Sequence, residues 1–300
     1  MSVPPEAAAA PPETGVIHNI GYRSYTGPRL GRGYATRSLF VLSLRGAFGL
    51  GRSARSKVLP MILLAVMCIP VLVIVAVTVV TGLDELPVEY TQYVGNTDLL
   101  LAIFIAAQAP VALSRDLRFK TVPLYFSRPL TRTDYVRAKF AAMTAALLVL
   151  TGLPVLILYA GALLAGLPVG HNTAHALYGL GLALLYSLIY AAIGLVIAAT
   201  TSRRGFGVAA IIGVLVVSTL VAGITWALLG GPSGTDGANW AALLSPSTLA
   251  GSLSTWLFQL PHGDGPSWPP STAAGFVFLA EFMVVLAASY ALLLRRYRKF

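Results

Sequence analysis

The stretch Ser114–Lys139, SRDLRFKTVPLYFSRPLTRTDYVRAK, is a polar island between two strongly apolar runs. Only Asp116 and Asp134 oppose its seven cations. Those cations are Arg115, Arg118, Lys120, Arg128, Arg132, Arg137 and Lys139. Charged side chains are costly to place in hydrocarbon, so a segment of this kind marks one side of a membrane. The polar island therefore defines the topology of the chain and offers a surface on that side.

The composition indicates an all-α polytopic membrane protein. Hydrophobic residues make up 56% of the 300 positions and charged residues 11%, whereas soluble domains carry roughly a quarter charged residues. The single cysteine, Cys68, lies within an apolar run, which excludes an intramolecular disulfide and a cysteine metal cluster. The net charge of +10 would favour nucleic acid as a partner, unless the cations serve another purpose.

Six apolar runs are long enough to predict membrane-spanning helices. They cover about 58–83, 97–114, 140–167, 174–199, 205–230 and 273–294. Pro60 and Pro70 should kink the first helix. The second has a short apolar centre and must borrow turns from Thr97 or from Ser114 onwards. Thr131, followed three residues later by Asp134, predicts a capping box at the start of the third.

A further apolar run, 241–260, is not expected to cross the membrane. It is rich in Ser and Thr and contains Pro246 and Gly251, which disfavour a lipid-facing helix. Counting it as a crossing would also place the cations of the C-terminus opposite the other basic loops. We expect short re-entrant helices here, dipping in from the outer face before the last span.

The six-span interpretation places all 21 Lys and Arg residues on one side. Eight precede the first span, seven lie in the polar island, two form the Arg203–Arg204 turn and four follow the last span. The three opposite loops contain none. Positively charged loops stay in the cytoplasm, so both termini are predicted to be cytoplasmic in a multi-pass plasma-membrane protein. The net charge is then a topology signal, and nucleic-acid binding loses its support.

The sequence ahead of the spans divides into two segments. We predict a disordered tail over 1–21, a basic juxtamembrane or interfacial segment over 22–57, and the transmembrane domain over 58–300. Four arginines of the middle segment fall within an arc of about 80° on a helical wheel, which favours a helix lying among lipid headgroups. They are Arg37, Arg45, Arg52 and Arg55. An ordinary basic juxtamembrane segment is the equal alternative.

No catalytic, cofactor-binding or metal-binding constellation is predicted, so the chain is not expected to be an enzyme. Gly231–Gly234, GPSG, matches a serine-protease pattern but falls in an outer loop. His171 and His175 have a spacing that could hold a metal, but no carboxylate or Cys is near them in sequence. Two solvated loop histidines are expected instead. None of the four lysines follows a glycine, so a Walker A loop is missing.

Glu281 is the only formally charged residue deep in a predicted span. Its burial in ionised form is costly, so it either lines a substrate path or locks helices, or it is a protonated structural residue. Gln108 in the second span is the nearest comparable polar group, and both are candidates for a translocation path. A stand-alone secondary transporter or membrane-embedded enzyme using Glu281 is the alternative function. Such transporters usually carry several intramembrane ionisable groups and an internal repeat, which this sequence lacks.

Within the polar island, a set of residues fits the pattern L-x-x-S-R-P-[IVL]-[ST]-R-x-x-[YF]-[IVL]-x-x-K. They are Leu124, Ser127, Arg128, Pro129, Leu130, Thr131, Arg132, Tyr135, Val136 and Lys139. The chain thereby resembles the membrane subunits of type-2 (ABC-2) ABC transporters, many of them exporters, and its composition is similar to actinobacterial members. The resemblance implies a permease subunit that dimerises with itself or a homologue and binds separate ATPase subunits. ATP would be bound by those partners, and this chain would need no cofactor.

The resemblance also implies that 116–126 forms a coupling helix docked in a cleft of the ATPase, although Pro123 should shorten or kink it. Independently, Phe119, Val122 and Phe126 recur at helical spacing beside a basic flank, which suits a partner groove. The alternative is that these aromatics sit at the headgroup boundary. The predicted coupling residues are Asp116, Arg118, Phe119, Lys120, Val122, Tyr125, Phe126 and Arg128.

Overall fold

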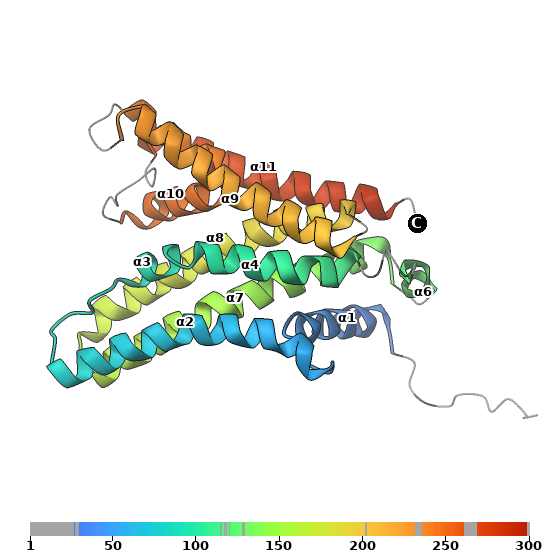
Figure 1. Ribbon diagram of the computed structural model, residues 1–300, viewed down its shortest axis with the longest axis horizontal. Helices are drawn as coiled ribbons and strands as arrows, with labels where there is room; N and C mark the ends of the chain where they lie inside the picture. Colours follow the sequence, from blue (N-terminus) through green and yellow to red (C-terminus); the bar gives the residue numbers. More distant parts are fainter. Residues whose placement is uncertain are drawn as a thin grey trace, which may run out of the picture. The chain divides into compact units, whose positions relative to one another are not determined.

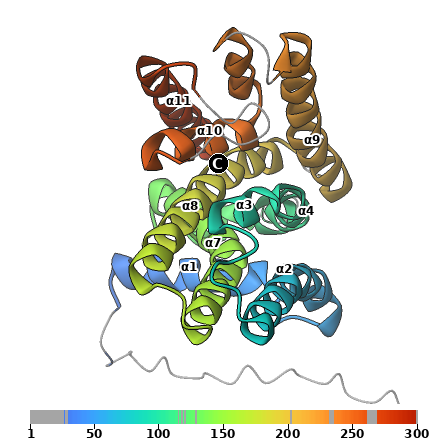
Figure 2. The same cartoon turned by 90° about the vertical axis from the view of Figure 1, so that its left-hand side faces the viewer.

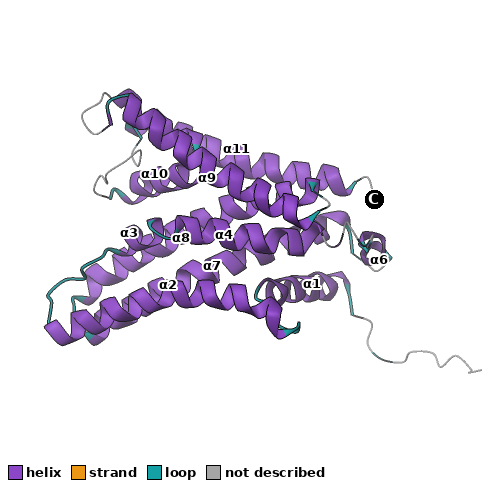
Figure 3. Ribbon diagram, viewed as in Figure 1, coloured by secondary structure: helices purple, strands orange, loops and turns teal. Residues whose placement is uncertain are grey.

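The computed structural model describes most of the chain, and its regular structure is helical throughout the described part (Figure 3). Described are residues 27, 30–114, 116, 119, 121–127, 130–201, 203–231, 236–260 and 269–298. The chain separates into Met1–Leu30 and a helical unit, Gly31–Phe300. The tail predicted over 1–21 lies outside the described residues.

Five of the described helices are long and apolar enough to cross a membrane, which confirms an all-α polytopic membrane protein. They are α2 (Ala54–Thr81), α7 (Arg132–Leu164), α8 (Val169–Thr200), α9 (Arg204–Leu228) and α11 (Thr272–Tyr297). The remaining predicted span corresponds to α4 (Asp98–Ala109), which continues into one π-helical turn, η1 (Pro110–Ser114). Together, α4 and η1 cover Asp98–Ser114, close to the predicted bounds of 97–114.

The first turn of α7 shows why the helix begins where the polar island ends. Thr131 Oγ1 accepts a hydrogen bond from the Asp134 N–H at 3.3 Å, and Asp134 Oδ2 accepts one from the Thr131 N–H at 3.1 Å. This arrangement is the predicted capping box, and it satisfies two backbone donors that have no partner within the helix.

The core of the helical unit is centred on α7 and α8. Residues of α8 contact α4, α7, α9, α10 and α11, and Figure 2 shows α8 amid these helices. Gly194 of α8 permits a close approach to α4, because a Cβ there would lie 2.4 Å from Cγ1 of Ile105. Small residues let helix backbones meet in this way inside membranes. By contrast, α2, α9 and α11 leave most of their apolar surface exposed.

The two ends of the helical unit differ in charge. In Figure 1, α1 (Arg32–Ala47) and α6 (Val122–Phe126) lie at the same end as the C-terminus, while α3 (Tyr90–Gly95) and α10 (Pro246–Phe258) lie at the other. Every described Lys and Arg belongs to α1, to the first turns of α2, α7 and α9, or to the last turn of α11 and the residues beside these turns. We call this end the basic end.

The run 241–260 forms part of the 3₁₀ helix η3 (Asp236–Leu244) and then α10, which has 13 residues. A helix of 13 residues is too short to cross the hydrocarbon layer, in agreement with its rejection as a span. It packs against α8, α9 and α11 at the end opposite the basic end.

One expectation for the basic N-terminal segment is wrong. The four arginines do not share one helix, because α1 ends at Ala47 and α2 begins only at Ala54. Gly49 and Gly51 between them adopt φ values of 68° and 80°, which side-chain-bearing residues rarely tolerate. Figure 2 shows α1 lengthwise and α4 nearly end-on, so α1 runs across the direction of the spans.

Candidate functional site

The start of the polar island is tied to α7 by a buried charge pair. Lys139 Nζ lies 3.0 Å from Asp116 Oδ2 and donates to the backbone oxygen of Ala112 at 3.0 Å. The Tyr135 hydroxyl donates to the same Asp116 oxygen at 2.8 Å. Because the Lys139 side chain is only 9% exposed, these acceptors replace the water that the ammonium group loses. Asp116 therefore faces the helical unit.

An aromatic cluster ties the end of the island to α7 and α11. Tyr135 is fully buried, and its ring centroid lies 5.5 Å from that of Tyr125, 6.1 Å from Phe126 and 4.9 Å from Tyr297. These separations are typical of aromatic pairs, which contribute beyond the area they bury. Tyr125 and Phe126 are half-buried, so both side chains pack on the helical unit.

The other described coupling residues do not belong to one continuous helix. Within the range 116–126, the described residues include a helical residue at Asp116, a turn at Phe119 and the five residues of α6. Pro123 lies at the start of α6, where a missing N–H costs nothing. Phe119 lies in a turn before α6 and is 62% exposed, so it does not continue the helical ridge. Leu124, 67% exposed, is the apolar side chain that α6 does present. Arg118, Lys120, Arg128 and the side chain of Val122 lie outside the described residues.

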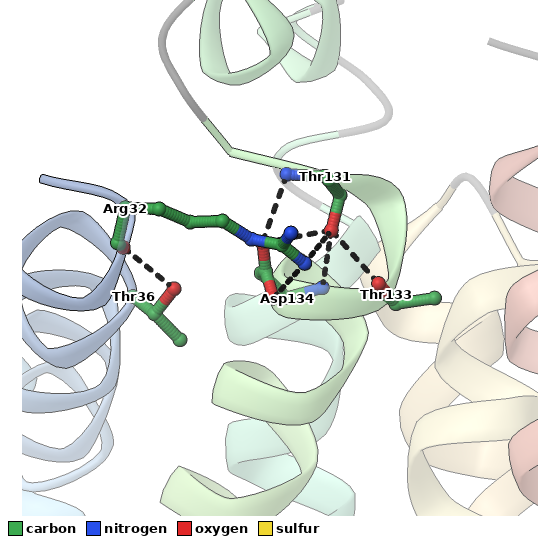
Figure 4. Close-up of polar contacts among 5 residues, drawn as sticks. All are labelled: Arg32, Thr36, Thr131, Thr133 and Asp134. Atoms are coloured by element: carbon green, nitrogen blue, oxygen red, sulfur yellow. Dashed lines mark hydrogen bonds and ion pairs between the residues drawn. The ribbon is translucent and has the colours of Figure 1, made fainter.

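Arg32 of α1 forms a clamp on the end of the island (Figure 4). Its Nε lies 2.5 Å from Asp134 Oδ2, and its Nη2 donates to Asp134 Oδ1 and to Thr131 Oγ1, each at 2.9 Å. This is the bidentate geometry in which a guanidinium binds a carboxylate most strongly. The hydrogen bond with Asp134 raises the pKa of Arg32 above its ordinary value. Sequence reasoning missed this contact, because 102 residues separate the partners.

The two candidates for a translocation path are not brought together. Gln108 on α4 is 6% exposed and lines a cavity at the basic end. Glu281 lies on α11, half-buried, and is not among the described residues that line this cavity. The helix α8 contacts both α4 and α11. The structure thus gives the two residues separate surroundings.

At the opposite end, hydroxyl groups gather around the start of α4. Thr219 of α9 lies 3.0 Å from Ser245 and 3.1 Å from Ser247, and the two serine oxygens are 3.0 Å apart. The Ser247 hydroxyl lies close to the carboxyl group of Asp98. Asp98 belongs to the first turn of α4. This polar cluster was not predicted.

The histidine motif weighed as a metal site is part of a helix in the structure. His171 and His175 lie on the first turns of α8 rather than in a loop, with ring centroids 4.0 Å apart. Within the described part of the chain, no three His, Cys, Asp or Glu side chains are grouped closely enough to hold a metal ion. The serine pattern at 231–234 lies largely outside the described residues.

Comparison with known proteins identifies the architecture around this site. Residues 88–294 match a family model described as ABC-2 family transporter protein, a span that runs from just before α3 to the last turn of α11 and includes the polar island. A search of curated proteins found no match to the chain. The family match covers more than half of the chain and the helical architecture agrees with it, so the chain belongs to the ABC-2 family of transporter proteins.

Proposed function

We propose that the chain is the permease subunit of an ABC exporter and couples through residues 115–128 to a separate ATPase subunit. Membership of the ABC-2 family supports a permease component of an ABC transporter. The observation that carries the coupling proposal is the double attachment of the polar island. Asp116 is bonded to Lys139 and Tyr135, and the rings of Tyr125 and Phe126 pack on Tyr135. A displacement of the island would therefore be passed directly to α7.

Two exposed apolar side chains define the surface that we assign to the ATPase. Phe119 and Leu124 are 62% and 67% exposed, and Phe119 also borders a cavity at the basic end. Burial of each in a partner groove would stabilise the complex by about 1.5–3 kcal/mol. The cations of the island, Arg118, Lys120 and Arg128, would meet carboxylates at the rim and set orientation, with single pairs contributing at most about 1 kcal/mol.

The proposal includes a second permease subunit, with the basic end in the cytoplasm. In each of the candidate spans α2, α9 and α11, only 22% of the most apolar stretch is buried within this chain. Their exposed faces would contact lipid or the second subunit. The transport direction is tested with inside-out membrane vesicles, where an exporter accumulates its substrate only when ATP is supplied outside.

The coupling surface is tested with Phe119→Ala/Leu124→Ala. We expect this variant to insert normally but to lose most of the ATPase that co-purifies from the native membrane, measured as bound ATP hydrolysis per permease. The matched control is Leu164→Ala/Leu228→Ala, which removes two side chains, each 82% exposed, from the opposite end. Phe126 is not used, because its packing on Tyr135 would mix folding with docking. Retention of a full complement of active ATPase by the first variant would contradict the docking role.

A further inference from the structure

A cavity of about 690 Å³ opens at the basic end, between the α1–α2 turn, the end of α4 and the start of α9. Its volume lies in the range of small-ligand sites, about 300–1,000 Å³. The residues that carry the argument are Arg52, Arg55, Leu59, Gln108, Val111 and Arg204. They come from three parts of the chain that only the fold brings together.

Gln108 indicates that this space is built for a polar occupant. Its side chain is 94% buried, yet it lines both this cavity and an adjoining one. No other group in the described part of the chain hydrogen-bonds its amide. A buried amide carries two N–H donors and one carbonyl acceptor, and leaving them unsatisfied costs about 1–3 kcal/mol. A ligand or water in this cavity can satisfy them.

The positive charge of the cavity lining favours a negatively charged occupant. Three guanidinium groups line it, and none of its described lining residues is acidic. Asp116 borders the adjoining cavity but is already paired with Lys139 at 3.0 Å. Guanidinium groups match phosphate oxygens in geometry and are less strongly hydrated than ammonium groups. The cavity therefore suits a phosphate-bearing anion.

The apolar wall of the cavity indicates where that phosphate comes from. Leu59 and Val111 line it. On either side of Leu59, α2 carries exposed apolar side chains, such as Val58 and Ile62, each 53% exposed. We propose that the cavity binds the phosphate headgroup of an anionic lipid through Arg52, Arg55, Arg204 and Gln108, with the acyl chains along α2. The same phosphate chemistry is offered by soluble phosphate esters, so the test separates the two sources.

Binding is measured on the purified full-length chain in neutral detergent, without ATPase, so the outcome does not depend on the proposed coupling. The probes are short-chain phosphatidylglycerol, zwitterionic phosphatidylcholine and glycerol 3-phosphate. We expect phosphatidylglycerol to bind at least about tenfold more tightly than phosphatidylcholine, since each arginine near the charge adds attraction. Arg52→Gln/Arg55→Gln/Arg204→Gln should abolish this preference. Gln108→Leu should weaken phosphatidylglycerol binding by about threefold to tenfold.

The matched control is Arg37→Gln/Arg203→Gln/Arg295→Gln, which removes three exposed cations from the same end but none from this cavity. It should change the affinity less than about twofold, because these cations lie outside the cavity and act on the bound phosphate only from a distance, where salt screens them. An equal loss in both triple variants would overturn the proposal and assign the attraction to net surface charge. Arginine-dependent binding of glycerol 3-phosphate as tight as that of the lipid would overturn the lipid source and assign the site to a soluble ester. If Arg52→Gln/Arg55→Gln/Arg204→Gln unfolds, the test rests on Gln108→Leu alone. Unchanged phosphatidylglycerol binding by Gln108→Leu would then overturn the proposed lipid site.

Discussion

Lys139 of α7 binds the start of the polar island through its ion pair with Asp116. Its ammonium group is buried beside Asp116, under the ring of Tyr135, whose centroid is 5.5 Å away. A buried pair is weak evidence for net stabilisation, but removing one partner leaves the other charge uncompensated. Lys139 is the last position of the sequence motif in the polar island, but the motif did not indicate that its partner would be Asp116.

We predict that Lys139→Met lowers the free energy of unfolding by about 2–3 kcal/mol, the lower end of the range for broken buried pairs, because Asp116 keeps 15% of its side chain exposed. Thermal unfolding in detergent, followed by tryptophan fluorescence, measures the change. Lys57→Met is the control, since Lys57 is an exposed lysine at the same end. Adding Asp116→Asn to Lys139→Met should recover part of the loss. A purely additive double variant would show that the two side chains are not coupled.

At the scale of elements, the contact between α4 and α8 depends on the size of one residue. Gly194 faces Ile105, whose side chain is completely buried. Gly213 in α9 offers the opposite case, because a Cβ there would meet nothing within 4 Å. The two glycines are equally helical, so comparing them separates helix packing from helix propensity.

Alanine at these two positions should change stability with opposite signs. Gly194→Ala adds a Cβ 2.4 Å from Ile105 and should cost about 1–3 kcal/mol of unfolding free energy, as other overpacked cores do. Gly213→Ala should instead stabilise by roughly 0.5–1 kcal/mol, because alanine loses less conformational freedom in a helix. Melting temperatures of both variants in the same detergent provide the measurement. Shifts in the same direction would exclude the close approach of α4 and α8.

At the scale of the whole molecule, the distribution of charge is the signal for orientation. All described cations lie at one end of the helical unit, together with the C-terminal end of α11. Membrane insertion retains Lys and Arg in the cytoplasm, so the proposed orientation follows from this one-sided distribution. It would place the lipid cavity in the cytoplasmic leaflet.

Single cysteines test this orientation in a Cys68→Ala background. Cysteines at Ser53 and Ser127, at the basic end, should be shielded from an impermeant maleimide in intact cells and react only after lysis. Cysteines at Glu85 and Ser271, at the opposite end, should react in intact cells. All four positions are exposed or half-exposed, so accessibility alone does not explain a difference. Labelling of Ser127→Cys from outside would reverse the topology and move the coupling surface away from any cytoplasmic ATPase.

The sequence by itself determined the features that depend on local pattern and on the solvent. Apolar length predicted the spans, because hydrocarbon requires about 20 apolar residues per helix. The capping box at Thr131 and Asp134 was predicted because its two hydrogen bonds involve neighbours in the chain. The family resemblance was carried by the motif of the polar island, and the family match confirmed it.

Only the tertiary structure decided which distant residues meet. The clamp of Arg32 on Asp134, the pair of Lys139 with Asp116 and the cavity between α2, α4 and α9 join parts of the chain that no periodicity relates. Helical spacing within the predicted coupling helix did not reveal the turn at Phe119, although Pro123 had indicated that the helix would be shortened or kinked. Likewise, the arc of arginines assumed one helix, whereas Gly49 and Gly51 turn the chain between two. Local pattern determines which faces are apolar or charged, but packing decides which of those faces come together.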